Sequence, residues 1–260
     1  MPSLEKSKII PLFKSHYSFG RSILTLKEPV DNPDLEASDS VFQIVKDSGL
    51  KEVFLVEDDM SGFLEAHKRS KELGVKLIFG RRVTIDADEP ITKFNPDHKL
   101  IIFARNDEGA RLLMKIESKM FCENNGLLNQ EFLLGENGLW SNDLMLAVPF
   151  YDSFLHVNAF TFSRCVFRLD SLNPVFFLED HSKPIDQFLQ DIVLTYCNDH
   201  GYESMRTHSI YYKEKKDVSA LMAHKIICNK SFGKKKTLDC PNLDHFGSNT
   251  FCWESYNELG

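Results

Sequence analysis

The sequence lacks the features of a secreted, membrane-spanning or disulfide-stapled protein. No run approaches the roughly 18 consecutive apolar residues that a membrane-spanning helix needs, and Met1–Ile10 has no long apolar signal-peptide core. The six cysteines include no C-x-x-C pair, so neither a zinc ribbon nor a small disulfide scaffold is indicated. We therefore expect a cytoplasmic protein with reduced thiols and no contact with a membrane.

Several sequence patterns of nucleotide-binding and hydrolytic sites are also missing. The chain contains no phosphate-binding loop, no dinucleotide-binding glycine pattern and no serine-hydrolase elbow. It has no internal repeat, coiled coil or low-complexity tract. These absences give no support to nucleotide-dependent or serine-hydrolase chemistry.

The chain has no excess of positive charge. It carries 38 acidic and 31 basic residues, a formal net charge of -7, which argues against a protein that coats nucleic acid by itself. A local run of Lys234, Lys235 and Lys236 is a possible contact for phosphates, although three exposed lysines are usually only solvated. We expect DNA to be contacted at most indirectly.

What the sequence does contain is an alternation of helix and strand patterns. With 260 residues, 42% of them hydrophobic, the chain is long enough for one large core. Residues 40–48 predict a helix that ends at Gly49, followed by a buried strand over Val53–Val56. Residues 60–73 predict a second helix that ends before Gly74, followed by a strand over Val75–Phe79. This order is typical of parallel β/α units.

The same alternation continues along the chain. Further strands are expected over Leu100–Ala104, Leu144–Val148, Val175–Leu178 and Glu203–Thr207, and further helices after Asn106, over Ile185–His200 and over Val218–Cys228. Successive units of this kind favour a β/α barrel, open or closed, with functional residues at the C-terminal ends of the strands. A doubly wound open sheet is the alternative.

Two internal stretches and the end of the chain resemble a known family. Residues 54–85 resemble a passage in which a strand ends in a metal-binding Asp-His, followed by a helix, G-I-K-P-I-I-G and a metal-binding Glu. Residues 100–119 resemble A-K-N-E-E-G-Y-x-N-L-M-K-L-V-S, and residues 237–259 resemble the T-L-x-D and F-Y-L-K-S-P-E-E-M region. These patterns are similar to the PHP domain of the alpha subunit of bacterial DNA polymerase III, without the palm, fingers and thumb that would follow.

The resemblance implies the architecture. It predicts an α/β fold, a distorted, TIM-like (β/α)7-type PHP barrel, in a single domain over residues 1–260. Residues 1–232 would form the barrel and residues 233–260 a small irregular C-terminal extension.

The resemblance also implies where metal ligands would lie, and most of those ligands are replaced. The family's H-x-H falls on Leu12 and Lys14, its Asp-His pair on 56–57 or 57–58, its Glu on Arg82, and the Asp and His of T-N-D-V-H-Y on Ser209 and Tyr211. The degenerate positions are therefore Leu12, Lys14, Glu57, Asp58, Arg82, Ser209 and Tyr211. Leucine has no lone pair to give, and an ammonium repels a cation. We expect no catalytic residues and no metal cofactor, and thus a pseudoenzyme.

The two new cations have a predicted structural role. Lys14 and Arg82 would supply positive charge where metal ions stand in the family, and would pair with Glu57, Asp58 or Asp59 to hold the strand ends together. A desolvated acidic cluster without such counter-charge would cost several kcal/mol per ion in order of magnitude.

A rearranged metal site is the competing hypothesis. It would draw on His16, Glu57, Asp58, Asp59, Glu179, His181 and His208, would bind Mn, Mg or Zn, and would act as a phosphoesterase or 3'-5' exonuclease. Against it, the acidic run Glu57–Asp59 is typical of a solvated turn or helix cap, and residues 179–181 are typical of a loop after a strand.

The sequence thus predicts a replication-associated scaffold. The resemblance implies as partners a polymerase catalytic subunit, a proofreading exonuclease or a clamp loader. One part of a split polymerase, and a viral or mobile-element derivative, both fit this pattern. A DNA-binding module is a third hypothesis, which the acidic net charge disfavours.

Overall fold

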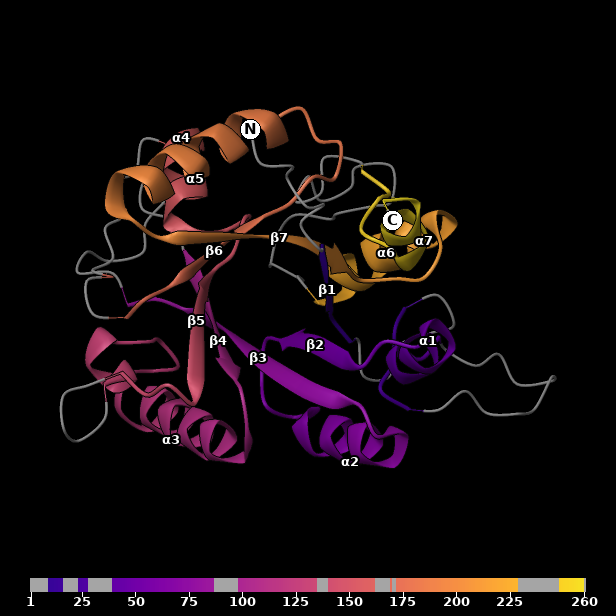
Figure 1. Cartoon of the computed structure of the whole chain (residues 1–260), viewed down its shortest axis with the longest axis horizontal. Helices are drawn as coiled ribbons and strands as arrows, with labels where there is room; N and C mark the ends of the chain where they lie inside the picture. Colours follow the sequence, from indigo (N-terminus) through magenta and orange to yellow (C-terminus); the bar gives the residue numbers. More distant parts are fainter. Residues whose placement is uncertain are drawn as a thin grey trace, which may run out of the picture.

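Seven strands close into a barrel in chain order (Figure 1). The computed structural model describes residues 9–15, 23–27, 39–86, 98–134, 140–161, 169, 172–228 and 248–259. The strands are β1 (Ile10–Phe13), β2 (Glu52–Glu57), β3 (Lys76–Thr84), β4 (Lys99–Ala104), β5 (Leu144–Val148), β6 (Val175–Leu178) and β7 (Glu203–Ile210). The distorted, TIM-like α/β barrel that the sequence predicts is confirmed, and the doubly wound open sheet is wrong.

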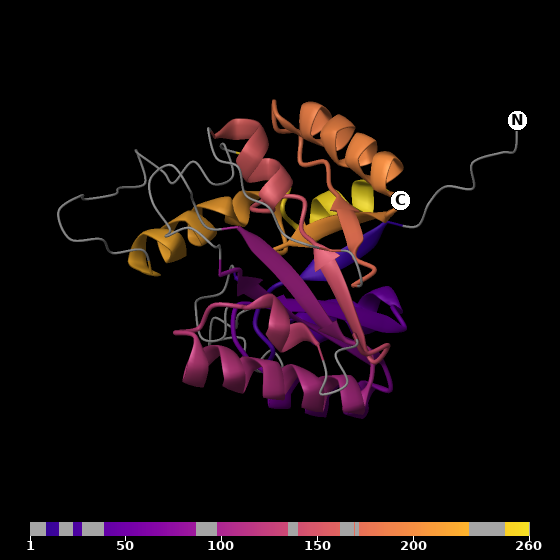
Figure 2. The same cartoon turned by 90° about the vertical axis from the view of Figure 1, so that its left-hand side faces the viewer.

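Helices cover the barrel on opposite sides. They are α1 (Val41–Ser48), α2 (Phe63–Leu73), α3 (Asp107–Glu123), α4 (Phe154–Phe160), α5 (Asp186–His200), α6 (Val218–Cys228) and α7 (Trp253–Glu258), with 3-10 turns η1 (Gln130–Leu133) and η2 (Lys215–Asp217). Figures 1 and 2 show α2 and α3 on one side of the barrel and α4 and α5 side by side on the other. The described residues contain no helix long and apolar enough to cross a membrane.

The predicted helix signals act as expected at several ends. Ser40 caps α1 by accepting a hydrogen bond from the N–H of Gln43, and Gly49 ends it with a left-handed backbone, φ 68°. Gly201 ends α5 in the same way. The second helix begins at Phe63 instead of residue 60, because Asp59 accepts hydrogen bonds from Ser61 in a turn before it. Asp59 therefore belongs to a turn and does not cap the helix.

One strand runs against the predicted direction. β4 is antiparallel to both β3 and β5, whereas the other neighbouring pairs in the barrel are parallel. The expectation of parallel units throughout is therefore wrong at β4. Its run Leu100–Ala104 is buried on both faces, and a strand that is buried on both faces has the same hydrophobic pattern in either direction.

The apolar core has two parts, one inside the barrel and one between the strands and the helices. Because side chains alternate along a strand, every second residue points inward, and these residues fill the barrel with Leu12, Val56, Ile78, Ile101, Phe103, Ala147, Val175 and Phe177. A larger core lies between the outer face of the strands and the helices. The interior is packed, so a site for chemistry or binding has to lie at the mouth of the barrel.

The described part of the C-terminal extension packs against the first and last strands. Trp253 stacks on Phe13 with ring centroids 5.7 Å apart, and the hydroxyl of Tyr256 donates to the carbonyl of Ile9 at 3.1 Å. The backbone of Cys252 forms an isolated parallel β-bridge with Tyr212, just beyond β7. The extension includes the helix α7, so it is more regular there than the sequence suggested.

Candidate functional site

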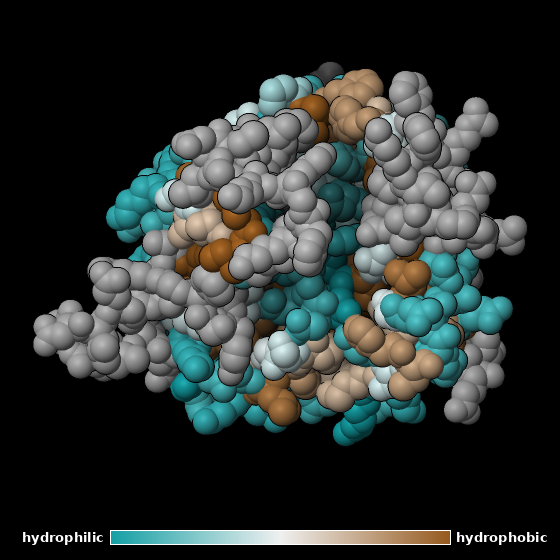
Figure 3. Space-filling view, turned by 180° about the vertical axis from the view of Figure 1, so that it is seen from behind, coloured by the Kyte–Doolittle hydropathy of each residue, from teal (hydrophilic) through white to brown (hydrophobic). Residues whose placement is uncertain are grey.

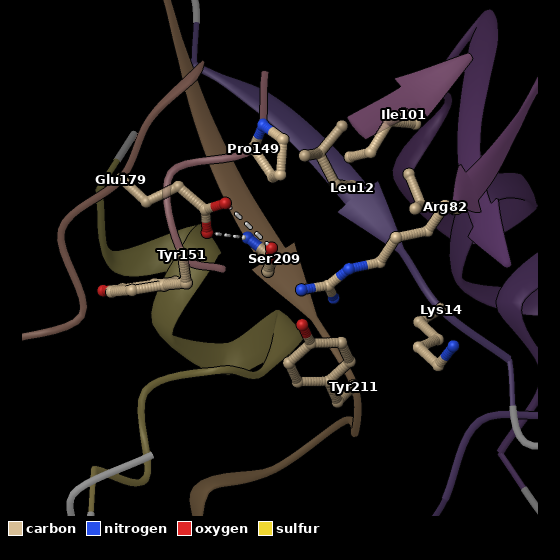
Figure 4. A pocket seen from close by; sticks show the side chains of 10 residues that line it. Leu12, Lys14, Arg82, Ile101, Pro149, Tyr151, Glu179, Ser209 and Tyr211 are labelled. Atoms are coloured by element: carbon tan, nitrogen blue, oxygen red, sulfur yellow. Dashed lines mark hydrogen bonds between the residues drawn. The ribbon is translucent and has the colours of Figure 1, made fainter. Parts of the chain in front are cut away.

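A pocket lies at the mouth of the barrel (Figure 4). Its lining consists of Leu12, Lys14, Val56, Arg82, Ile101, Pro149, Tyr151, Glu179, Ser209 and Tyr211. The structure thus brings together five of the positions at which the sequence places lost metal ligands, namely Leu12, Lys14, Arg82, Ser209 and Tyr211. Glu57 and Asp58 lie directly beside this pocket, at and just after the end of β2.

The register of β1 and β7 explains why these residues meet. Leu12 lies opposite Ser209 in this parallel pair. Because side chains two residues apart share a face of a strand, Lys14 follows Leu12 and Tyr211 follows Ser209 toward the mouth. Leu12 is only 4% exposed and belongs to the core inside the barrel. The floor of the pocket is therefore apolar and its rim is polar.

Lys14 forms an ion pair with Asp58. Burial favours a higher pKa for Asp58, but the charges of Lys14 and then Arg82 outweigh it and lower the pKa of Asp58 to about 2. The carboxylate is thus charged at neutral pH. This pair joins the residue after β1 to the residue after β2, as the sequence predicted for Lys14.

Arg82 has a different partner from the one predicted. Its side chain extends across the pocket toward Ser209 and Tyr211 (Figure 4) and forms an ion pair with Asp152. Burial opposes the charge of Arg82, but Asp152 and then Tyr211 raise its pKa above the usual value, so the guanidinium stays charged. The direct ion pair of Arg82 is thus with Asp152 and not with the predicted Glu57, Asp58 or Asp59, although its charge also helps to lower the pKa of Asp58. Asp152 lies near Arg82 because its carbonyl accepts a hydrogen bond from the N–H of Lys99 at 2.8 Å, and Lys99 is paired with Thr84 at the end of β3.

Sequence reasoning missed Asp152. It has a left-handed backbone, with φ 61°, a conformation in which aspartate and asparagine are enriched among non-glycine residues. Burial favours a higher pKa for Asp152, but Arg82 and Lys99 lower it. The only sequence signal is an aspartate in a loop after an apolar strand, which is too common to identify a site.

Glu57 has hydrogen-bond partners of its own, which differ from those of its acidic neighbours Asp58 and Asp59. It is buried and accepts from the N–H and the hydroxyl of Ser15, at 2.9 and 2.5 Å. Burial raises the pKa of Glu57 to about 7, although Lys14 and Ser15 act in the opposite direction. Asp59 faces solvent in its turn with Ser61. The three acids in a row therefore have three different environments.

Glu179 is held by donors from two elements. It accepts from the N–H of Ser209 at 2.9 Å, from the hydroxyl of Ser209 at 3.0 Å and from Nε2 of His181 at 2.7 Å. Burial opposes ionisation, but the hydrogen bond from His181 leads the effects that lower the pKa of Glu179. An ionised carboxylate only accepts, so Nε2 of His181 carries the proton. Both oxygens of Glu179 are thus occupied by protein donors.

The remaining predicted residues have structural surroundings or lie outside the described part. His208 is buried, and its Nε2 lies 2.9 Å from the carbonyl of Thr250. Burial and then His181 lower the pKa of His208 to about 4, so it is neutral at pH 7. Asp180 is exposed and accepts from the N–H of Ser182. His16, Lys234, Lys235 and Lys236 are outside the described residues.

The described side chains do not fit a metal cluster. Among them, no three His, Cys, Asp or Glu residues lie close enough together to hold an ion. Glu57, Asp58, Asp59, Glu179, His181 and His208 are therefore not assembled as one ligand set. The charged groups that extend into the pocket from β3 and from the end of β1 are a guanidinium and an ammonium, which have no lone pair for a metal.

Comparison with known proteins adds little to this geometry. No protein-family model matches the chain, and no curated protein sequence matches it. The similar solved structures include a candidate metal-dependent phosphoesterase from Bifidobacterium adolescentis. That crystal structure has 9% sequence identity and a TM-score of 0.39, covering 84% of this chain and 97% of that chain. A similarity this low leaves the function to be argued from the residues of this chain.

The raised pKa of Glu57 predicts a dependence of stability on pH. Folding raises the pKa from 4.5 to about 7, so the native state binds a proton that the unfolded chain releases. This contribution is complete below pH 4.5 and is lost as the pH rises through 7. Glu57→Gln keeps an acceptor for Ser15 without the charge. The unfolding free energy of the variant relative to the wild type should therefore rise by about 1–3 kcal/mol as the pH goes from 4.5 to 8. Urea denaturation of both proteins at these two pH values measures this difference.

Glu52→Gln is the matched control, because Glu52 is an exposed acid at the start of the same strand. Its unfolding free energy should follow the wild type at both pH values. An unchanged pH slope in Glu57→Gln would show that the native state does not protonate this carboxyl.

The ion pair between Arg82 and Asp152 predicts that substitution of its two residues lowers the unfolding free energy by different amounts. The side chain of Arg82 is 16% exposed and that of Asp152 is 50% exposed. Asp152→Asn keeps a side chain that tolerates the left-handed backbone but leaves a largely buried guanidinium without its counter-ion. We expect a loss of about 1–3 kcal/mol in unfolding free energy. Arg82→Gln should cost less, because water can solvate the half-exposed carboxylate.

Urea denaturation of both variants checks this order. Lys76→Gln is the control, since its ion pair with Glu52 is exposed on both sides, and such pairs contribute roughly 0–1 kcal/mol. A larger loss in Arg82→Gln than in Asp152→Asn would contradict the assignment of Asp152 as the counter-ion that Arg82 requires.

Proposed function

We propose that this chain is a catalytically inactive PHP-like barrel, related to the N-terminal part of the alpha subunit of bacterial DNA polymerase III, that serves as a scaffold in DNA replication. The observation that carries the proposal is the pair of cations at the mouth, Lys14 with Asp58 and Arg82 with Asp152. Hydrolysis of a phosphodiester by metal ions needs several anionic or imidazole ligands that converge on one place.

The electrostatics of the pocket support this proposal. The carboxylates nearest to it already have partners: Asp58 and Asp152 pair with the cations Lys14 and Arg82, and Glu179 accepts hydrogen bonds from Ser209 and His181. A divalent ion would have to displace these partners and then lie beside an ammonium and a guanidinium. The cost of bringing like charges together in a partly desolvated site opposes such binding.

The proposed partners follow from the resemblance in the sequence. They are a polymerase catalytic subunit, a proofreading exonuclease or a clamp loader, with DNA contacted at most indirectly. A β/α barrel without metal chemistry still presents loops and helices on which partners can bind. The competing hypothesis is a phosphoesterase or 3'-5' exonuclease that uses Mn, Mg or Zn in a rearranged site.

An assay with labelled single-stranded DNA separates the two hypotheses. We expect the purified chain to release no product above buffer with Mn²⁺, Mg²⁺ or Zn²⁺, and to bind less than about one ion per chain by elemental analysis. Cleavage that disappears in an Asp58→Asn, Asp59→Asn double variant would contradict the proposal, because it would place a working metal site at these carboxylates.

Co-purification from the native cell tests the scaffold role. We expect mass spectrometry of the tagged chain to find at least one of the proposed replication proteins enriched, since a scaffold holds its partners without turnover. A tagged variant with Arg82→Gln shows whether the ion pair at the mouth of the barrel affects the enrichment of these proteins. Enrichment of replication proteins no greater than with an unrelated tagged protein would contradict the proposed role.

A further inference from the structure

The outer surface of α4 and α5 exposes apolar side chains next to one another. The two helices lie side by side at the top of Figure 1, and the view from behind shows hydrophobic residues at the same top edge (Figure 3). Phe160 at the end of α4 is 40% exposed and Phe188 in α5 is 56% exposed. Their rings meet edge to face with centroids 5.9 Å apart.

A third apolar side chain extends this surface along α5. Leu194 is 39% exposed, and Phe188, Asp191 and Leu194 follow one another at a spacing of three residues. Residues at this spacing are neighbours on a helix, so the acidic Asp191 lies between two apolar side chains. We call Phe160, Phe188, Asp191 and Leu194 the α4–α5 ridge. Single exposed apolar residues are common, but a contiguous group marks a binding surface more often.

The charge of the ridge has one sign. Helices α4 and α5, like the short α7, contain no lysine or arginine, whereas α1, α2, α3 and α6 each contain at least one. Exposed acids are present at Asp191 and Asp199, and within the described residues neither forms an ion pair. The amide of Gln187 donates to Asp191 at 3.2 Å and leaves its charge uncompensated.

We infer that the α4–α5 ridge binds a basic amphipathic segment of a partner protein. The apolar side chains of that segment would cover Phe160, Phe188 and Leu194, and its lysines or arginines would lie beside Asp191 and Asp199. Amphipathic helices bind grooves and ridges in this way, and opposite charges steer the encounter. This inference rests on the proposed function as a protein-interaction module and adds the chemistry of the partner.

A synthetic peptide provides the test. The probe is a fluorescent 14-residue peptide of leucine and lysine with helical amphipathic spacing, titrated with the full chain and followed by anisotropy. We expect Phe188→Ser and Asp191→Lys each to weaken binding about tenfold, as expected for an aromatic anchor and a charge in an interface centre. Both residues are exposed, so circular dichroism should show that the variants fold like the wild type.

Matched controls separate this surface from non-specific attraction. Leu64→Ser removes an apolar side chain of α2 that is 77% exposed, and Glu123→Lys makes the same change of charge as Asp191→Lys on α3. Both should bind the peptide within about twofold of the wild type. The same peptide with glutamate in place of lysine should not bind.

Several outcomes would overturn the inference. One is that Glu123→Lys and Asp191→Lys weaken peptide binding equally, and another is that Phe188→Ser leaves peptide binding unchanged. A third is that the free chain forms a dimer that Phe188→Ser abolishes, which would assign the ridge to a second copy of the chain. The proposed function fails separately. Metal-dependent cleavage of DNA would contradict it with peptide binding intact, whereas replication proteins that still co-purify with a ridge variant would contradict the ridge alone.

Discussion

Neutralisation of charge at the mouth of a closed barrel is the constraint on which the rest of this site depends. Lys14 and Asp58 join the ends of β1 and β2, and Arg82 and Asp152 join β3 to the loop after β5. Charges held partly out of water are costly unless each has a partner. In a metal-dependent barrel, ions would supply the positive charge. In this barrel the side chains of Lys14 and Arg82 supply positive charge, and their ion pairs link β1 to β2 and β3 to the loop after β5.

Two further carboxylates, one in the pocket and one beside it, also have hydrogen-bond donors. Glu179 is occupied by Ser209 and His181, and Glu57 by Ser15. A hydrolytic site would keep acceptors open for an ion or for a water that attacks the substrate. These contacts and the two ion pairs link strand ends at the mouth of the barrel, although the buried Nε of Arg82 has no hydrogen-bond partner among the described residues. On the outside of the barrel, α4 and α5 combine apolar and acidic side chains in the ridge that we propose as a binding surface.

Sequence reasoning was most successful where a pattern repeats over many residues. The helices before Gly49, Gly74 and Gly201 and the buried strands gave the barrel, because period and end signals are local properties. The direction of β4 was not predictable, since burial on both faces leaves no directional mark. The seven-residue α4 is too short for a clear period. Asp152 could not be predicted as the partner of Arg82, because that contact depends on how β3 and β5 are placed in three dimensions.

Leu12 shows how the core of this barrel reaches the mouth. Its position in the strand points inward, where the resemblance would place a metal-binding imidazole. As leucine it is 4% exposed and packs with Val56 and Ile101 inside the barrel. Full burial of such a side chain stabilises a protein by about 1.5–3 kcal/mol. A leucine at this position therefore extends the apolar core inside the barrel toward its mouth.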